Sequence, residues 1–547
     1  MKFVGLTLAV VSGCLVASRT EEPQVVVHTT CGAARGIVRS TTAGPALALL
    51  GIPFAEPPLG ERRFKKPALK KPWRGVLDAT SLPPMCPQNP TRINSYFAIS
   101  EADPTSEDCL FLNVYAPARN DTLLKPVVVY VHGGAFTYGG ISMKIFDASE
   151  LAVRGDLVAV TIAYRLGPLG FLYMGTEDAP GNMGLYDQQL AMQWVKENAR
   201  FFGGDPNSIT VMGQSAGAIS IGFHLLSPSS AGLFKRAFMQ SGSPFIGAFI
   251  STQEEAASRT DMLASYLECK EKDSHELSGA EVVTCLRSKD IGDILKALEY
   301  FDEAEFNGFF PFFGGDFAHG KLVKEFAQYP PNVRDVLVSV CSGEGDFLIA
   351  YLLARLNIVE NLGKVTQRRM EAIMRLVLSR ALVGVDIDAI IERYLGPVSG
   401  QNAVEVARAS GDILGDWLFG CPAVSLVRAL AAANVSVHVL RYSEQLSFLD
   451  WPEWVRPTHS DDIVFSLGSG FNLGGSPSDA DVTATENLIN VVSTFARNGV
   501  PKVTDGTRWP KFDEEGQYLH IRNGSNVQEK HFLESTCNFW HNVLPHE

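Results

Sequence analysis

The sequence predicts an α/β fold with a large, mostly parallel sheet that is covered by helices on both faces. Continuous apolar runs, typical of strands buried on both sides, alternate with segments of helical spacing along most of the chain. No internal repeat is visible, and no linker is long enough to separate domains. The 547 residues are therefore interpreted as one large domain behind a targeting segment.

The predicted elements alternate in the order that a parallel sheet requires. Strands are predicted at residues 126–131, 157–164, 208–212, 236–240, 336–341 and 437–442. Helices are predicted at residues 186–201, 216–226, 348–356, 365–382, 404–432 and 482–496. In sheets of this kind the ligand site lies at the carboxyl ends of the strands.

The N-terminus has the features of a secretory signal peptide. Lys2 precedes an apolar run at residues 3–16, and small residues at 16–18 offer a cleavage site. The run is too short for a transmembrane helix, and no second stretch is long and apolar enough to span a bilayer. We therefore expect a signal peptide at residues 1–18, a single mature domain at 19–547, an extracellular location and no stable membrane anchor.

Composition fits a secreted protein and argues against some partners. The net charge is −13 and there is no basic run, which disfavours nucleic acid and anionic membranes as partners. Sequons for glycosylation stand at Asn120, Asn434 and Asn523. Nine cysteines are present, of which Cys14 leaves with the signal peptide, and spacing alone does not choose among the pairings of the other eight. Nothing in the sequence points to a particular oligomeric state.

Ser215 is the strongest candidate for a catalytic residue. It lies in Gly-Gln-Ser-Ala-Gly at residues 213–217, between the predicted strand 208–212 and the predicted helix 216–226. A serine at such a junction is forced onto a sharp turn that lifts its hydroxyl clear of the sheet, and small neighbours are needed to avoid collisions. This strand–turn–helix setting is that of the nucleophile elbow of α/β-hydrolases.

A serine nucleophile needs a base to take its proton and a carboxylate to orient the base. In this fold the acid and then the histidine follow the serine along the chain. Six histidines qualify by order: His438, His459, His520, His531, His541 and His546. His459 is favoured because it lies in a loop after the last strong strand. Glu344, just past the strand 336–341, is favoured as the acid by position, since any of 60 carboxylates fits by type.

The transition state also needs backbone N–H groups that approach the developing oxyanion. Gly133 and Gly134 follow the strand 126–131 directly, within His-Gly-Gly-Ala-Phe at residues 132–136. With the N–H of Ala216, after the nucleophile, they would form an oxyanion hole of three donors.

Several motifs in one order resemble the type B carboxylesterases, the carboxylesterase/cholinesterase group, over nearly the whole mature length. The matching segments are Gly-Ile-Pro-Phe-Ala-Glu-Pro-Pro at 51–58, Glu-Asp-Cys-Leu-Phe-Leu-Asn-Val at 107–114, residues 132–136, Tyr-Arg-Leu-Gly at 164–167 and Gly-Gly-Asp-Pro at 203–206. The resemblance implies an α/β-hydrolase fold, a small-molecule ester as substrate, and neither metal nor cofactor. It also implies a triad of Ser215, His459 and Glu344 with Gly133, Gly134 and Ala216 as oxyanion donors.

The resemblance further implies the disulfides. Cys86 with Cys109 and Cys269 with Cys285 match two loops shared in the family. Cys421 with Cys537 matches a third bridge typical of cholinesterases, and Cys31 and Cys341 are left without partners.

Departures from the cholinesterases bear on the substrate. These enzymes hold a quaternary ammonium against a tryptophan in the first disulfide loop, but none lies between Cys86 and Cys109. Gln214 stands where glutamate is common, and Ser460 where glycine is usual. A secreted serine carboxylesterase is therefore the leading hypothesis. A cholinesterase, and a non-catalytic adhesion or carrier protein of the same fold, are the alternatives.

Overall fold

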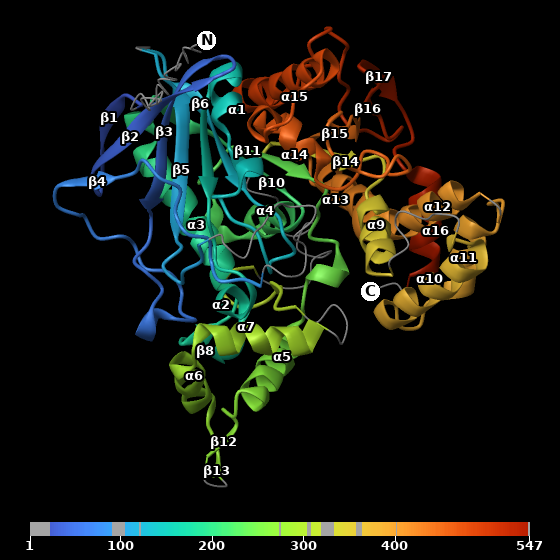
Figure 1. Cartoon of the computed structure of the whole chain (residues 1–547), viewed down its shortest axis with the longest axis horizontal. Helices are drawn as coiled ribbons and strands as arrows, with labels where there is room; N and C mark the ends of the chain where they lie inside the picture. Colours follow the sequence, from blue (N-terminus) through green and yellow to red (C-terminus); the bar gives the residue numbers. More distant parts are fainter. Residues whose placement is uncertain are drawn as a thin grey trace, which may run out of the picture.

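A computed structural model describes residues 22–89, 104–119, 122–272, 275–302, 308–318, 333–356, 364–400 and 402–544. Within these residues the chain folds around one 13-stranded sheet, with the strand order β1-β2-β3-β5-β7-β6-β10-β11-β14-β15-β16-β17 and β4 paired with β2 (Figure 1). The strands are β1 (Gln24–Thr29), β2 (Gly32–Thr41), β3 (Gly44–Pro53), β4 (Val76–Asp78), β5 (Phe111–Pro117), β6 (Lys125–Val131), β7 (Val158–Ile162), β10 (Gly204–Gln214), β11 (Arg236–Gln240), β14 (Asp335–Cys341), β15 (Ser436–Ser443), β16 (Tyr518–Arg522) and β17 (Ser525–Glu529).

The centre of this sheet is parallel, as the sequence predicts. Strands β7, β6, β10, β11, β14, β15 and β16 pair in parallel, and antiparallel strands flank them on both sides. Every strand predicted from an apolar run lies in this parallel block. The outer strands β1, β2 and β17 are largely exposed or half-buried and lack continuous apolar runs, so apolar runs do not predict them. The flanking strands β3 and β5 are mostly buried, and the predicted set does not include them either.

Helices surround the sheet and complete the α/β architecture. They are α1 (Ser149–Gly155), α2 (Gly167–Phe171), α3 (Met183–Asn198), α4 (Ala216–Leu226), α5 (Gln253–Tyr266), α6 (Gly279–Ser288), α7 (Ile291–Asp302), α9 (Asp346–Arg355), α10 (Gln367–Ala381), α11 (Ile387–Leu395), α12 (Ala403–Gly415), α13 (Cys421–Ala432), α14 (Asp461–Ser466), α15 (Asp479–Asn498) and α16 (Glu534–Val543). Short strand pairs β8 (Tyr173–Thr176) with β9 (Ala179–Pro180), and β12 (Glu271–Lys272) with β13 (His275–Glu276), lie outside the main sheet.

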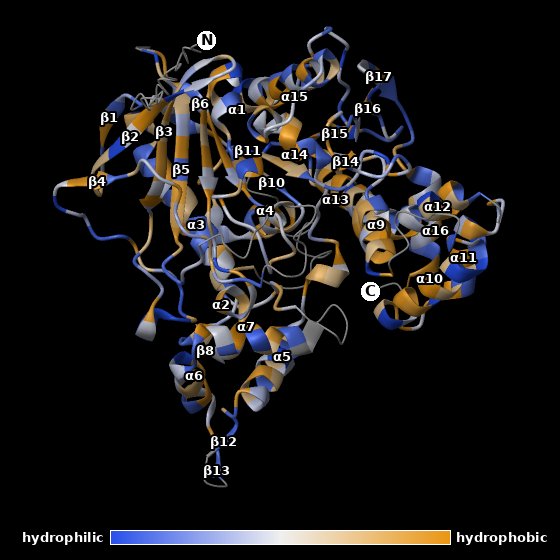
Figure 2. Cartoon of the chain, in the orientation of Figure 1, coloured by the Kyte–Doolittle hydropathy of each residue, from blue (hydrophilic) through white to orange (hydrophobic). Residues whose placement is uncertain are grey.

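Two apolar cores lie on opposite faces of the sheet. Alternate residues of β6 enter different cores: Val127 and Val129 pack in the core with α3, α4 and α13, whereas Val128 and Tyr130 pack in the core with α1, α14 and α15. This follows from the two-residue period of a strand. The central strands are accordingly hydrophobic along most of their length (Figure 2). Such burial explains why their sequences read as unbroken apolar runs.

A third core joins helices α9 to α12 with Trp540 of α16. In Figure 1 these helices form a group beside the end of the sheet that carries β14 to β16. The helix predicted at 404–432 is interrupted here, because a π-helical segment, η8 (Asp416–Gly420), separates α12 from α13. The stretch Ala403–Ala432 is long and apolar enough to cross a membrane, but 72% of its most apolar window is buried, as in the core helix of a globular fold.

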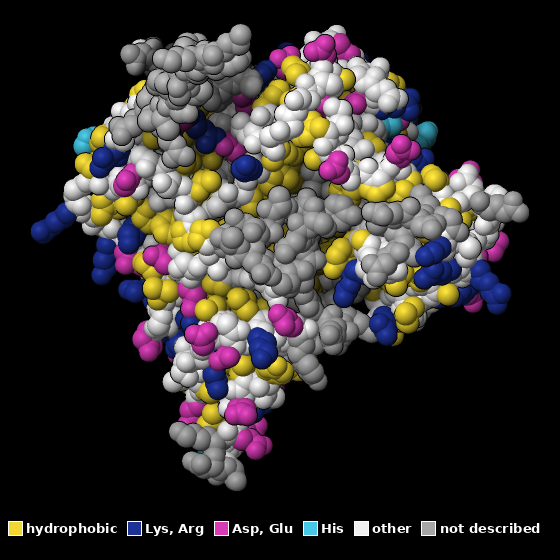
Figure 3. All heavy atoms as spheres, in the orientation of Figure 1, with side chains coloured by type: hydrophobic (Ala, Val, Ile, Leu, Met, Phe, Trp, Pro, Cys, Tyr) yellow, Lys and Arg dark blue, Asp and Glu magenta, His cyan; other side chains and the backbone are white. Residues whose placement is uncertain are grey.

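Charged side chains of both signs are mixed on the face shown in Figure 3. Acidic and basic groups stand next to one another there, so on that face the net charge of −13 is not gathered into one acidic patch. This distribution supports a role in solubility for the acidic balance.

Three disulfides are present in the structure, and they are the three pairs that the resemblance implies. They join Cys86 to Cys109, Cys269 to Cys285, and Cys421 to Cys537. Cys31 and Cys341 are free thiols, and burial raises the pKa of the Cys341 thiol. The Cys421–Cys537 bridge spans 116 residues and ties the start of α13 to α16, whose Trp540 is buried in the third core.

Replacing Cys537 with serine should therefore destabilise the fold. We expect a loss of roughly 2–5 kcal/mol in the free energy of unfolding, because the unfolded chain is no longer constrained across a long loop. Thermal and denaturant unfolding measure the effect, and Cys31→Ser, which breaks no bridge, serves as the control. A peptide map without reduction that links Cys31 to Cys341 would contradict the assignment.

Candidate active site

Ser215 occupies a strained turn between β10 and α4, two elements whose labels lie near the centre of Figure 1. Its φ of 55° and ψ of −121° lie in a region that residues with a side chain seldom adopt. The turn is held from one side by the Ser215 N–H, which donates to the Gln240 carbonyl at 2.8 Å. On the other side a Cβ on Gly213 would lie 2.8 Å from the Gly217 carbonyl carbon and 3.0 Å from the Val131 oxygen. The two glycines of the motif are thus required by this close approach.

The glycines after β6 lie beside the serine. Gly134 has a φ of 113°, and a Cβ there would collide with the Tyr138 backbone. Among the described residues, no acceptor is found for the N–H groups of Gly133 and Gly134. Ala216 is the first residue of α4, where N–H groups lack intrahelical acceptors. The three predicted oxyanion donors are therefore free to bind an anionic oxygen.

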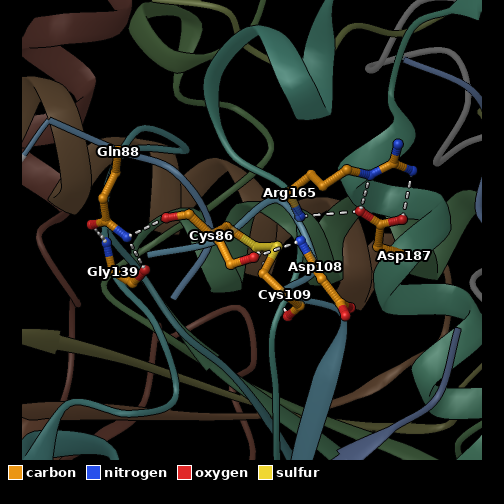
Figure 4. Close-up of a disulfide and its surroundings, with 8 residues drawn as sticks. Cys86, Gln88, Asp108, Cys109, Gly139, Arg165 and Asp187 are labelled. Carbon is orange, nitrogen blue, oxygen red and sulfur yellow. Dashed lines mark hydrogen bonds and ion pairs between the residues drawn. A yellow bond between two sulfur atoms is a disulfide. The ribbon is translucent and has the colours of Figure 1, made fainter. Parts of the chain in front are cut away.

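The first disulfide supports this glycine loop (Figure 4). Two residues after Cys86, the Gln88 side chain donates to the Gly139 carbonyl and accepts from the Gly139 N–H, both at 2.8 Å. A Cβ on Gly139 would lie 2.8 Å from the Gly133 oxygen, so these two residues of the glycine loop are in close contact. The Gln88 side chain, next to the disulfide, therefore supports the backbone on which Gly133 packs.

His132, in the same motif, has a structural role. Burial lowers its pKa to about 4, so the ring is neutral. Its Nδ1–H donates to the Gly133 carbonyl at 2.8 Å, and its ring stacks on Tyr164 with centroids 4.4 Å apart. The Tyr164 hydroxyl also donates to the His132 carbonyl, at 2.9 Å. These contacts hold the backbone from which Gly133 and Gly134 follow.

Glu344 and His459 are in direct contact. The His459 Nδ1 lies 2.7 Å from Glu344 Oε2, and Glu344 Oε1 accepts from the Ser241 hydroxyl at 2.5 Å and from the Cys341 N–H at 2.7 Å. The loops that carry them are themselves joined, since the Gly343 N–H donates to the Pro457 carbonyl at 2.8 Å. The acid is therefore oriented by three donors and by the end of β14.

Two phenylalanine rings stack on the His459 ring. The Phe419 ring stacks at 4.1 Å between centroids and the Phe347 ring at 5.1 Å. Phe419 belongs to η8, and no motif in the sequence points to it as a neighbour of His459. The available signal was the presence of Gly411, Gly415 and Gly420 in a predicted helix, because glycines are unfavourable inside helices and mark a break or a close contact.

The other carboxylates near His459 have different partners. Asp346 forms a two-point ion pair with Arg456, at 2.9 and 2.7 Å. Asp461 accepts from the Thr458 N–H and the Trp451 indole, and burial raises its pKa to about 7. Neither carboxylate is bonded to the imidazole, so Glu344 is the candidate acid that the geometry supports.

Ser215, His459, Gly133, Gly134 and Gln214 line one small cavity of about 20 Å³. The Nε2 of His459 contacts the Gln214 side-chain nitrogen at 3.0 Å, a contact that no sequence motif indicates. The structure thus places Ser215, His459, Gly133 and Gly134 around one cavity, with Glu344 on one nitrogen of the histidine and a glutamine amide on the other.

Five phenylalanines lie between residues 306 and 313, ahead of Glu344, and most of those that the structure describes belong to the core. Phe309, Phe310 and Phe312 are buried, and Phe313 stacks on Phe223 with centroids 4.1 Å apart. Phe306, and also Asn120, lie outside the described residues. The sequons at Asn434 and Asn523 are exposed at turns. Among the described residues, no group of three or more metal-binding side chains is placed to hold an ion.

Comparisons with known proteins show the family to which the chain belongs. A profile described as "Carboxylesterase family" matches residues 23–540. The chain is 32% identical to the acetylcholinesterase of Bungarus fasciatus over 552 residues, which covers 98% of this chain and 89% of that protein. It is 33% identical to the cholinesterase of Mus musculus over 543 residues, or 96% of this chain and 88% of that protein.

Proposed function

This chain belongs to the carboxylesterase family and is a carboxylic ester hydrolase, and on that premise we propose that it is a secreted serine carboxylesterase with Ser215 as its nucleophile. His459 is the general base and Glu344 the residue that orients it. The observation that carries this assignment is the 2.7 Å contact between His459 and Glu344, beside a cavity that Ser215 also lines.

In the proposed reaction the Ser215 oxygen attacks the ester carbonyl carbon while His459 Nε2 takes the hydroxyl proton. The carbonyl oxygen becomes an oxyanion that accepts hydrogen bonds from Gly133, Gly134 and Ala216. His459 then gives its proton to the leaving alcohol, and an acyl-enzyme remains. Water, activated by the same histidine, hydrolyses the acyl-enzyme and restores Ser215. Glu344 stabilises the imidazolium in both halves of the reaction.

Uncharged esters are the substrates that we propose. A choline ester gains from a cation–π contact and from nearby negative charge. The disulfide loop between Cys86 and Cys109 has no tryptophan to supply the ring, and the residue before the nucleophile is the neutral Gln214. Apolar side chains that line the cavity beside Ser215, those of Met143, Phe146 and Ile463, favour apolar acyl or aryl groups.

A choline-ester hydrolase is the second candidate. The two relatives above are named acetylcholinesterase and cholinesterase, and the Cys421–Cys537 bridge matches the pattern that the resemblance implies for that group. The two candidates share the triad and differ only in whether a cation is recognised.

A pair of matched thioesters separates the two candidates. We expect 3,3-dimethylbutyl thioacetate, in which carbon replaces the ammonium nitrogen, to be hydrolysed with a kcat/KM at least equal to that of acetylthiocholine. A tryptophan contact would favour the cation by about 2 kcal/mol, or roughly thirtyfold. Steady-state thiol release measures both rates, with phenyl acetate as a neutral oxygen ester for comparison. A kcat/KM for acetylthiocholine equal to or above that for phenyl acetate would support the cholinesterase instead.

Secretion is part of the proposal. Three disulfides and two exposed sequons suit an oxidising compartment. Expression in eukaryotic cells should deliver the enzyme to the medium with its first 18 residues removed, and N-terminal sequencing checks the cleavage site.

A further inference from the structure

The Gln214 side chain is hydrogen-bonded to Nε2 of His459. This is the nitrogen that would take the hydroxyl proton of Ser215. Because Glu344 accepts the proton on Nδ1, the neutral ring has its lone pair on Nε2. The Gln214 amide nitrogen lies 3.0 Å from this Nε2 and can only donate to it. A lone pair that already accepts this hydrogen bond is not free to receive the hydroxyl proton of Ser215.

The amide is held in this orientation by a second contact. Its other N–H donates to the Ser460 hydroxyl at 2.9 Å, so both amide hydrogens are used. Ser460 has a φ of 79°, a left-handed conformation that is unfavourable for serine and easy for glycine. Glycine would suit the backbone conformation at residue 460 better than serine. The serine hydroxyl, however, provides an acceptor for the Gln214 amide.

The surroundings of Gln214 leave little space for other arrangements. Its side chain is buried, and its oxygen lies 2.5 Å from the place where a Cβ on Gly133 would stand. Its backbone is the last residue of β10, paired with Gln240 of β11. The Gly133 side is therefore closed to the amide, whereas the cavity that Gln214 and Ser215 both line is open to it.

We propose that Gln214 is a positioning residue that holds the basic nitrogen of His459 in the free enzyme and releases it to Ser215 when an ester binds beside the serine. This inference rests on the proposed function, since it assumes that Ser215 and His459 react together. The buried hydrogen bond between Gln214 and His459 must then break before the serine can be activated.

Inactivation by diisopropyl fluorophosphate is a suitable readout because it starts from the free enzyme. The Ser215 oxygen forms a bond to phosphorus, fluoride leaves, and His459 takes the hydroxyl proton. Gln214→Met removes the donor and keeps a side chain of similar length. We expect its inactivation rate constant to rise about two- to tenfold, the equivalent of one net hydrogen bond. Ser460→Gly, which frees the amide and relaxes the backbone, should give a smaller rise.

A second glutamine provides a matched control. Gln188 is buried on α3, where its side-chain oxygen accepts from His224 Nε2–H at 3.0 Å and its nitrogen donates to the Ser220 hydroxyl at 3.1 Å. It is a buried glutamine with a histidine and a serine as partners away from the cavity, although the hydrogen bond to its histidine runs in the opposite direction. Gln188→Met should leave the inactivation rate constant unchanged, although thermal unfolding should occur at a lower temperature. This comparison separates release of His459 from the general effect of losing a buried amide.

The expected results test the holding role of Gln214 separately from the role of Ser215 as the nucleophile. The holding role would be overturned if the inactivation rate constant falls in both Gln214→Met and Ser460→Gly. It would also be overturned if the rate constant stays the same in both variants while they are folded. In either case Gln214 would be a structural support. If Ser215→Ala is still labelled by the fluorophosphate, the proposed nucleophile is wrong instead. Far-ultraviolet circular dichroism confirms that each variant is folded, and Ser460→Gly remains informative if Gln214→Met does not fold.

Discussion

Replacing Ser215 with alanine should lower the turnover of neutral esters by about six orders of magnitude while the fold remains intact. The loss is this large because a triad acts as a unit, and the base and the acid have no function once the nucleophile is absent. What activity remains comes from the oxyanion donors and from substrate binding. The elbow already tolerates a strained backbone, and alanine changes neither its φ nor the glycine contacts around it.

Hydrolysis of phenyl acetate and mass spectrometry after treatment with an organophosphate measure this effect. The label should be found on Ser215 alone. Ser220→Ala is the matched control, because it removes a buried hydroxyl from the second turn of α4, where the hydroxyl donates to the Ala216 carbonyl. Substantial turnover by Ser215→Ala, or a label on another serine, would falsify the assignment. A wild-type protein that neither hydrolyses esters nor takes the label would favour the adhesion or carrier hypothesis.

Glu344→Gln has the second largest expected effect. A neutral amide no longer stabilises the imidazolium, and its N–H can hold the ring in the wrong tautomer. We expect kcat to fall by about four orders of magnitude, with a much smaller change in KM. The Ser241 hydroxyl and the Cys341 N–H can still donate to the amide oxygen, so the loop should keep its place.

Asp461→Asn is the control for this prediction. Asp461 is buried two residues after His459, and its carboxylate accepts from the Thr458 N–H and the Trp451 indole rather than from the imidazole. We expect its kcat to stay within about tenfold of the wild type, a range smaller than the effect of a triad residue. If instead Asp461→Asn is the inactive variant and Glu344→Gln is not, the acid has been misassigned.

The parallel centre of the sheet could be predicted from the sequence because burial on both faces requires apolar runs. β6 and β14 begin within one residue of the predicted starts and end as predicted, and β11 agrees at both ends. The edges could not be predicted in this way. β1 and β17 expose one face to solvent and carry mixed polar residues, so their hydrophobic signal is weak.

In the site, too, residues with a local sequence signal could be predicted and residues without one could not. Ser215 and Gly133 could be located because a turn geometry dictates their local sequence. The stacking of Phe419 on His459, and the contact of Gln214 with the same ring, join residues far apart in the chain. No local pattern encodes such contacts, since they depend on how η8 and the histidine loop meet in three dimensions.

The π turn at η8 has a consequence for how this region could vary. A π turn holds one extra residue within a helix. The residues of α13 are therefore rotated about the helix axis relative to where an uninterrupted α-helix from α12 would place them. Deleting that residue would merge the two helices and rotate one of them by about 100° relative to the other. Phe419 would then turn from His459, or Cys421 would turn from Cys537. Sequences that lose or gain one residue here therefore have to give up either the ring stack or the bridge, whereas substitutions within the turn can keep both.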